Sequence, residues 1–251
     1  MAFAGAPSPR RAGHAETLRV HGTTVHVVAH PLERTEVRVV RLRTPSPLEA
    51  WCARHGVAEA VVGGFFVRGG KQDYRPLGEL RTRGIRRRSV PFDAPWGAIR
   101  ACLASAGTEI AIARRPDLPA RPRGDLLQAG PLLVSAGTPI VEDEEGFSAG
   151  AHQFDSDITR GRYPRAALAV TRDRILAVAC DGRADDENGL SLPELAQALA
   201  DLGAVTAINL DGGGSTSLVS QGELRNVPRE SHGVVLAGGR PIPTALAFTP
   251  R

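Results

Sequence analysis

The chain has 251 residues, a mass of 26.5 kDa and a formal net charge of +4. Its hydrophobic fraction of 42% and charged fraction of 23% are typical of a globular protein and exclude collagen, coiled coil and extensive disorder. No apolar run approaches the roughly 20 residues of a membrane helix. The N-terminus contains Pro and Arg and lacks the apolar stretch of a signal peptide. We therefore expect a cytoplasmic protein without membrane contact.

The positive charge is almost entirely arginine, since Lys71 is the only lysine. Arginine binds phosphate bidentately. A basic chain suggests nucleic acid, but aromatic residues make up only 4% and no nucleic-acid motif is present, so we disfavour that partner. Cys52, Cys102 and Cys180 show no CxxC spacing, which argues against disulfides and a thiolate metal site. We expect all three to be small core residues.

The N-terminal part predicts β-structure after a flexible tail at 1–15. A single domain is expected over 16–251. Apolar and polar residues alternate over 18–29 and 35–43, as in half-buried strands. His30-Pro31 lies between these strands, which predicts a hairpin or a meander.

A short helix follows the first two strands. Ser46 is its expected N-cap and Gly56 lies just past its end. The next segment, 59–67, predicts a buried strand that Gly63 and Gly64 interrupt. These glycines either let another segment approach closely or form a β-bulge.

The middle of the chain is less regular. Residues 68–98 are rich in Gly, Pro and Arg, and within them 83–90 predicts a solvated loop or an edge strand. Strands are expected at 109–114 and 126–134. The acidic run at 142–145 predicts an exposed excursion.

The C-terminal part predicts a fold class. Apolar runs over 165–171 and 174–181 indicate a hairpin. A capping box, Ser191-Leu-Pro-Glu194, starts an amphipathic helix that ends near Leu202, and a buried strand follows at 204–210. Strand, helix and strand imply a right-handed crossover with parallel strands in one sheet. We expect an α+β fold with a mixed, largely antiparallel sheet, few helices and this one β-α-β crossover.

The strongest local signal is INLDGGGSTSLV, residues 208–219. Three glycines directly after a buried strand are typical of unusual dihedrals or of a close approach to the backbone. Such a loop can point amide N–H groups at an anion, and Asp211 lies at the strand end. The alternative is a tight turn that Asp211 caps. The loop lacks the ending of a P-loop.

This loop, preceded by GLSLPELAQALADLGA, resembles the signature of the phosphodiester glycosidase family. Further segments match in the same order, over about residues 59–249: VVGGFF (61–66), LLQAGPLLVSAG (126–137), YPRAALAV (163–170), VACDGR (178–183) and RPIPTALAF (240–248). The chain departs from the family at Val62, where the family has Asn, and at Ala166 and Ala169, where it has Thr and Gly. These departures leave an altered substrate or lost catalysis open.

The resemblance implies hydrolysis of the glycosidic bond of a sugar-1-phosphodiester, giving free sugar and a phosphomonoester. A phosphate leaving group needs little protonation. The reaction still needs a carboxylate to activate water or stabilise an oxocarbenium-like centre, and donors for the phosphate. Two alternatives are a non-catalytic sugar- or phosphate-binding protein and a biosynthetic phosphoesterase that cuts a P–O bond.

Asp211 is the first candidate for the catalytic carboxylate. Arg165, which matches an arginine of the family, is a candidate phosphate ligand or else a surface residue, and Asp181 is a further catalytic candidate or else a turn residue. The candidate substrate and phosphate ligands are Gly212, Gly213, Gly214, Ser215, Thr216, Arg183, Gly63, Gly64 and Asn209. Glu79 and the run at 142–145 are possible second carboxylates, with solvated surface the preferred interpretation of the run.

No zinc or P-loop cofactor is implied by the sequence, and a divalent cation near Asp211 is left open. A small-molecule sugar phosphodiester or a phosphorylated glycoconjugate is the expected partner. Both a monomer and a homo-oligomer are compatible with the sequence.

Overall fold

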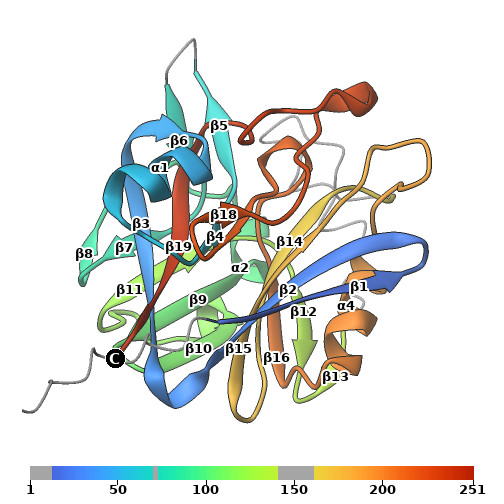
Figure 1. The fold of residues 1–251 in the computed structure, drawn as a ribbon. Coiled ribbons are helices and arrows are strands. Elements are labelled where there is room, and N and C mark those ends of the chain that lie inside the picture. Colours follow the sequence, from blue (N-terminus) through green and yellow to red (C-terminus); the bar gives the residue numbers. More distant parts are fainter. Residues whose placement is uncertain (1–12, 70–72, 141–160) are drawn as a thin grey trace, which may run out of the picture.

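The computed structural model describes residues 13–69, 73–140 and 161–251. The strands form one seven-stranded sheet, two five-stranded sheets and a two-stranded ribbon (Figure 1). In the described ranges every pair of named strands is antiparallel. The expected α+β class, with largely antiparallel sheet and few helices, is confirmed.

The seven-stranded sheet carries the strand that leads into the glycine-rich loop. Its order is β1 (His14–Val20), β2 (Thr23–Pro31), β15 (Arg174–Cys180), β14 (Arg165–Val170), β16 (Thr206–Asn209), β12 (Leu132–Ser135) and β13 (Thr138–Pro139). Helix α4 (Leu192–Asp201) packs against this sheet. In the described ranges no helix is long and apolar enough to cross a membrane.

The other two large sheets are built from strands distant in sequence. One has the order β18 (Glu223–Leu224), β17 (Leu218–Ser220), β4 (Ala60–Val62), β19 (Ile242–Pro250) and β3 (Thr35–Ser46). The second has the order β10 (Glu109–Arg114), β9 (Ala101–Ala106), β11 (Asp125–Gln128), β7 (Leu80–Thr82) and β8 (Ile85–Arg86).

The remaining elements are short. They are the ribbon strands β5 (Phe66–Arg68) and β6 (Tyr74–Pro76), helices α1 (Leu48–His55) and α2 (Trp96–Ile99), and the 3₁₀ turns η1 (Leu32–Arg34), η2 (Arg115–Asp117), η4 (Gly213–Ser215) and η5 (Ser231–Gly233).

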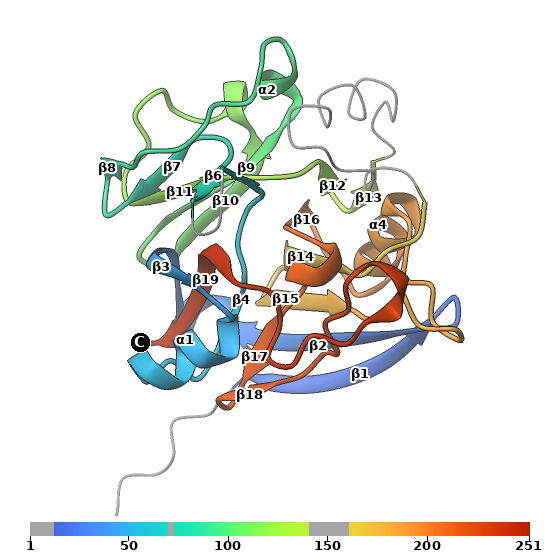
Figure 2. The same cartoon turned by 90° about the horizontal axis from the view of Figure 1, so that it is seen from above.

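Alternating residues of β14 build two apolar layers. Ala166 and Leu168 belong to a core that the three large sheets share, whereas Ala167 and Ala169 belong to the layer under α4. This is the period of two that the pleat of a strand imposes. In Figure 2 the strands β14 and β15 accordingly lie between α4 and the β3–β19 pair.

The predicted crossover is confirmed. β15 and β16 both pair antiparallel with β14, so they run parallel to each other with β14 between them. α4 connects them. Its capping box is formed, because the Ser191 hydroxyl accepts from the Glu194 N–H and the Glu194 carboxylate accepts from the Ser191 N–H.

Two boundaries and one strand pairing predicted for the N-terminal part are wrong. The strand predicted over 18–29 is split by a turn in which His21 and Gly22 both have positive φ, and the resulting β1 and β2 form their own hairpin. Since β1 begins at His14, the tail predicted over 1–15 is too long by its last residues, while 1–12 lie outside the described residues. The strands β2 and β3 lie in different sheets and do not pair with each other.

Two further segments differ from expectation. Ser46 ends β3, and Pro47 occupies the N-cap of α1, while Gly56 has φ +64° at the C-cap as expected. The strand predicted over 126–134 divides into β11 and β12, in different sheets. The break lies at Gly130, where a Cβ would stand 2.7 Å from the Asn209 carbonyl oxygen.

The interrupted strand at 59–67 is confirmed as β4 and β5. Its glycines permit close approach. A Cβ at Gly63 would stand 2.5 Å from Thr244 Oγ1, and one at Gly64 would stand 3.1 Å from the Gln128 carbonyl oxygen. Gly63 also accepts a hydrogen bond from the Asp211 N–H, so this packing places the glycine-rich loop.

We expect Gly63→Ala to lower the free energy of unfolding by about 1–3 kcal/mol, because the methyl group overpacks against Thr244. Gly56→Ala is the control: its Cβ would contact nothing within 4 Å, so only left-handed backbone strain of about 1–2 kcal/mol applies. Urea denaturation measures both. Wild-type stability of Gly63→Ala would contradict the packing described.

Candidate functional site

The site begins where β16 ends. The Asp211 N–H donates to the Gly63 carbonyl oxygen at 3.0 Å, and the Gly212 N–H donates to Asp211 Oδ1 at 2.9 Å. Only 7% of Asp211 is exposed. Its second oxygen, Oδ2, is buried and has no hydrogen-bond partner within the described residues. The carboxylate is therefore held through its backbone and one oxygen, while the other oxygen is left for a further donor.

Burial raises the pKa of Asp211 to about 6. The Ser215 hydroxyl, the Gly212 N–H and the charges of Arg240 and Arg68 act in the opposite direction. The Ser215 hydroxyl is near enough to favour the charged form, although its oxygen does not reach hydrogen-bond geometry within the described residues. Asp211 is consequently ionised at pH 7 and takes up a proton as the pH falls through 6.

Arg183 lies over the second glycine of the loop. A Cβ at Gly213 would stand 3.3 Å from each terminal nitrogen of its guanidinium group, and Gly213 has φ +59°. The guanidinium carbon lies 5.7 Å from the centre of the Tyr163 ring, and Nη1 donates to the Arg229 carbonyl oxygen at 3.3 Å. Gly213 therefore permits the left-handed backbone turn and leaves room for the Arg183 guanidinium group.

Arg240 lies over the third glycine. Its Nε donates to Glu230 Oε1 at 2.8 Å, and its Nη2 contacts Glu230 Oε2. A Cβ at Gly214 would stand 2.9 Å from Arg240 Nη2. Burial alone would raise the pKa of Glu230, but the bonds to Arg240 and the charges of Arg240, Arg68 and Arg183 hold this pKa below its ordinary value.

The site thus combines two carboxylates with three arginines. Glu230 and Asp211 both interact with Arg240 and Arg68, and Arg183 faces the same loop. Sequence analysis did not identify Glu230, Arg240 or Arg68. Arg240 opens the segment that matches the closing strand of the family, and this was the one signal that pointed to it.

Two of the three glycine amides in the loop are engaged inside the fold. The Gly212 N–H donates to Asp211, and the Gly213 N–H donates to the Pro164 carbonyl oxygen at 2.9 Å. The 3₁₀ turn η4 is closed by bonds from Ser215 to Gly212 and from Thr216 to Gly213. The expected display of free amides at 212 and 213 is therefore wrong, and guanidinium groups are the donors that face this loop.

Arg165 is not placed as predicted. Only 2% of it is exposed, its Nε donates to the Leu190 carbonyl oxygen at 2.7 Å, and its Nη2 donates to the Gly161 carbonyl oxygen at 2.9 Å. Burial lowers the pKa of Arg165 to about 10. Both the phosphate role and the surface role are replaced by a structural one, because the side chain ties two loops to β14.

Asp181 also has structural contacts. His26 Nε2 lies 2.8 Å from its Oδ2, and the Val227 N–H donates to its Oδ1 at 2.7 Å. Both oxygens are therefore occupied, and Asp181 anchors the segment after β18 to the seven-stranded sheet rather than facing Asp211.

Two other predicted residues lie at the two ends of the loop: Asn209 ends β16, and Thr216 is the C-cap of η4. Asn209 and Thr216 are buried, and Asn209 Oδ1 and Thr216 Oγ1 have no hydrogen-bond partner in the described part of the chain. The Thr216 carbonyl oxygen accepts from Asn226 Nδ2 at 2.9 Å. Asn209 and Thr216 are therefore buried flanking residues of the loop, whereas Asp211, Ser215, Arg183 and the three glycines are brought together.

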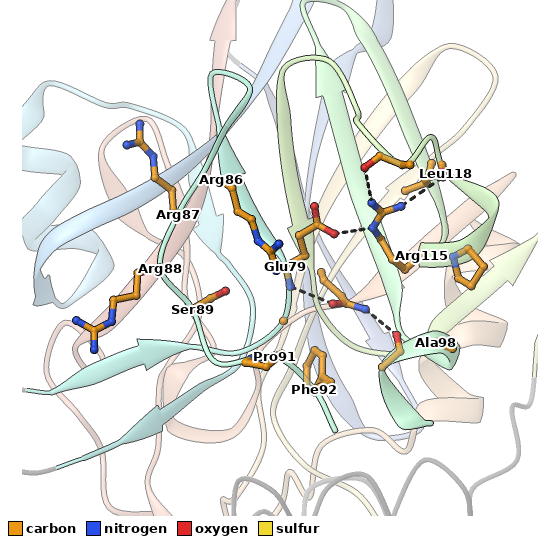
Figure 3. A pocket seen from close by; sticks show the side chains of 15 residues that line it. Glu79, Arg86, Arg87, Arg88, Ser89, Pro91, Phe92, Ala98, Arg115 and Leu118 are labelled. Atoms are coloured by element: carbon orange, nitrogen blue, oxygen red, sulfur yellow. Dashed lines mark hydrogen bonds and ion pairs between the residues drawn. The ribbon is translucent and has the colours of Figure 1, made fainter. Parts of the chain in front are cut away.

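Glu79 is fully engaged elsewhere. It lines a pocket of about 930 Å³ on the β10–β8 sheet, to which the glycine-rich loop contributes no residue (Figure 3). Its two oxygens bind Arg81 and Arg115, each at 2.7 Å. Burial would raise the pKa of Glu79, but these bonds hold it below the ordinary value. Glu79 is not the second carboxylate of the site. The run at 142–145 lies outside the described residues.

The three cysteines are free and buried, as expected. Burial raises the pKa of the Cys180 thiol to about 12, so this side chain is no thiolate nucleophile at neutral pH. Over residues 13–69, 73–140 and 161–251, no group of three or more His, Cys, Asp and Glu side chains is arranged to hold a metal ion.

The raised pKa of Asp211 predicts that the Asp211→Asn variant gains stability over wild type, by an amount that depends on pH. A folded-state pKa near 6, above the ordinary value of 3.8, means that this group favours folding below pH 3.8 and loses that contribution as the pH rises through 6. The variant should exceed wild type in unfolding free energy by on the order of 2–3 kcal/mol at pH 7, with the gain vanishing near pH 4. Thermal unfolding from pH 4 to 7 tests this, with exposed Asp186→Asn as control. A difference that does not change with pH contradicts it.

The chain matches one family model and resembles several solved structures. The family model for phosphodiester glycosidase matches residues 55–249. The zebrafish N-acetylglucosamine-1-phosphodiester alpha-N-acetylglucosaminidase catalytic domain, auto-inhibited by its pro-peptide, has a similar structure, with a TM-score of 0.66 and 20% identity over 95% of this chain and 82% of that one. No curated protein matches the sequence.

Two further solved structures share the fold. A hypothetical protein from Synechocystis gives a TM-score of 0.62 at 20% identity over 94% of this chain, which spans 61% of the Synechocystis protein. A protein from Burkholderia pseudomallei that is named as exported gives 0.61 at 17% identity, over 91% of this chain and 74% of that one. Since the family model covers most of the sequence, the chain belongs to the phosphodiester glycosidase family.

Proposed function

We propose that this chain hydrolyses the glycosidic bond of a sugar-1-phosphodiester and releases free sugar and a phosphomonoester. The observation that carries the proposal is the position of Asp211, a buried carboxylate at a strand end beside the guanidinium groups of Arg183 and Arg240. A carboxylate and fixed cations are what this reaction requires, because positive charge develops at the anomeric carbon while a phosphate departs.

Asp211 is the proposed general base. A buried carboxylate oxygen without a partner costs free energy unless a water or a substrate hydroxyl bonds to it, and Asp211 Oδ2 is such an oxygen. In the proposed step a water loses its proton to Asp211, and its oxygen forms a bond to the anomeric carbon. The bond from that carbon to the phosphate oxygen breaks, and the phosphate leaves with the electron pair.

The arginines are the proposed phosphate ligands. Arg183 and Arg240 place their guanidinium groups against Gly213 and Gly214, and Arg68 adds a third positive charge. Because its pKa is lowered, Glu230 stays ionised at neutral pH and is suited to orient Arg240, not to act as an acid. A phosphate is a weakly basic leaving group, so it can depart without a general acid to protonate it.

A non-catalytic binding protein is the second candidate, and Val62 favours it. This residue is completely buried at the end of β4, next to Gly63, where the resemblance predicts an asparagine. A screen of sugar-1-phosphodiesters, read for both free sugar and phosphomonoester, separates the two. Release of both products supports the hydrolase, and binding without release supports the alternative.

A cytoplasmic location of the protein stays a prediction.

Asp211→Asn should fold and lose at least about 100-fold in kcat, the low end of general acid–base contributions. Glu230→Gln should act mainly on KM, because it loosens Arg240 and leaves the base in place. Steady-state kinetics on the substrate found in the screen, with circular dichroism for folding, compare the two. A folded Asp211→Asn enzyme with most of its rate would reduce Asp211 to a turn residue.

Gly213→Val should abolish activity, because the added side chain displaces Arg183 from its position 3.3 Å away. Gly222→Val is the matched control, since Gly222 also has positive φ, at +82°, and a Cβ there would contact nothing within 4 Å. Both variants carry backbone strain, so equal loss of activity would show that strain, and not the arginine, is responsible.

A further inference from the structure

Arg183 has a backbone conformation that is uncommon for a residue other than glycine. Its φ is +60°, in the left-handed region. A Cβ at Gly233 would stand 2.8 Å from the Arg183 carbonyl oxygen, and one at Gly182 would stand 2.9 Å from the Pro164 nitrogen. These two glycines let neighbouring segments pack closely around the backbone of Arg183. Unfavourable conformations that their surroundings hold in place gather at functional sites, and this one directs an arginine to the glycine-rich loop.

The guanidinium group of Arg183 has few restraints of its own. Within the described residues its one hydrogen bond runs from Nη1 to the Arg229 carbonyl oxygen at 3.3 Å, and no carboxylate oxygen lies within 4 Å of it. A guanidinium group carries five N–H donors, so most of them are left for a ligand. The further restraint is the ring of Tyr163, whose centre lies 5.7 Å from the guanidinium carbon.

Tyr163 is itself firmly placed. Its N–H donates to the Leu190 carbonyl oxygen at 3.2 Å, and the Leu190 N–H donates to the Tyr163 carbonyl oxygen at 3.1 Å. A Cβ at Gly189 would clash with that carbonyl group. The next residue, Pro164, accepts a hydrogen bond from the Gly213 N–H at 2.9 Å. The segment that carries the ring therefore also holds the glycine-rich loop.

The same ring contacts a second arginine. The guanidinium carbon of Arg165 lies 5.8 Å from the ring centre of Tyr163, and this buried side chain is bonded to the carbonyl oxygens of Leu190 and Gly161. A cation within about 6 Å of a ring centre is attracted to the face of the ring. Tyr163 thus connects a structural arginine with the mobile end of Arg183.

We propose, on the basis of the function given above, that Tyr163 is a positioning residue for the reaction. Its ring holds the Arg183 guanidinium group over Gly213, where that group binds the phosphate of the substrate. A long arginine side chain that is already held in place loses less conformational entropy when the phosphate binds. Removal of the ring therefore weakens phosphate binding and leaves Asp211 in place.

Binding of methyl phosphate to the full chain, measured by isothermal titration calorimetry, tests this without turnover. Tyr163→Leu should raise the Kd by roughly 3- to 30-fold, the range expected for a cation–π contact. Tyr163→Phe keeps the ring and should change the Kd by less than about two-fold. In an Arg183→Gln background, Tyr163→Leu should have no further effect, because its contribution passes through Arg183.

Fluorinated phenylalanines at position 163 give a second measurement, which does not require that the fold tolerate leucine. Fluorine withdraws electrons from the negative face of the ring and changes its shape little. The Kd for methyl phosphate should therefore rise stepwise from phenylalanine through its monofluoro to its trifluoro derivative. A ring that only fills space would show no such trend.

Equal Kd values across the fluorinated series overturn the proposal. So does an effect of Tyr163→Leu that persists in the Arg183→Gln background, or wild-type binding that Arg183→Gln leaves unchanged. Ring-dependent binding of methyl phosphate with no hydrolysis of any sugar-1-phosphodiester would refute the proposed function and leave the role of Tyr163 in phosphate binding standing. Hydrolysis together with binding that does not depend on the ring would support the proposed function and refute the role of Tyr163.

Discussion

Keeping Asp211 ionised while it is buried is the constraint on which the site depends. Burial acts against the charge and raises the pKa of Asp211 to about 6, so compensating positive groups must lie nearby. Those groups are Arg240 and Arg68, and Arg183 lies against the same loop. The guanidinium groups at the loop need space. Gly213 and Gly214 provide it, because a Cβ at either position would stand about as close to Arg183 or Arg240 as van der Waals contact permits, or closer. The run of glycines accommodates guanidinium groups, and the amides of Gly212 and Gly213 are engaged inside the fold.

The rest of the fold fixes the positions of Asp211, the glycine-rich loop and the arginines. β16 lies inside the seven-stranded sheet and delivers Asp211 to the Gly63 carbonyl group of the neighbouring sheet. Asp181, directly after β15, accepts a hydrogen bond from the Val227 N–H, and Asn226 donates one to the Thr216 carbonyl oxygen. These two bonds fix the connection that carries Glu230. Buried polar side chains that bind backbone groups fix loops without relying on apolar packing. The site is consequently assembled from loops but positioned by two sheets.

Local patterns predicted the elements well and their partners poorly. Apolar runs identified β14, β15 and β16, and the capping box identified α4, since these signals lie within a few residues. Periodicity does not say which sheet a strand joins, so the division at Gly130 was missed. Arg165 was misassigned because the pleat directs it to the face of Ala167, under α4, where it binds loop carbonyl groups. Glu230 and Arg240 lie about 20 to 30 residues from Asp211 with no motif between them, and only the fold brings them to the loop.

The central claim is that the carbon–oxygen bond of a sugar-1-phosphodiester breaks at this site with Asp211 activating water. Hydrolysis in ¹⁸O-labelled water, with mass spectrometry of both products, tests the claim most directly. The account predicts one ¹⁸O atom on the anomeric hydroxyl of the released sugar and none on the phosphomonoester. Label on the phosphomonoester would mean that the P–O bond is cut, and would contradict the account.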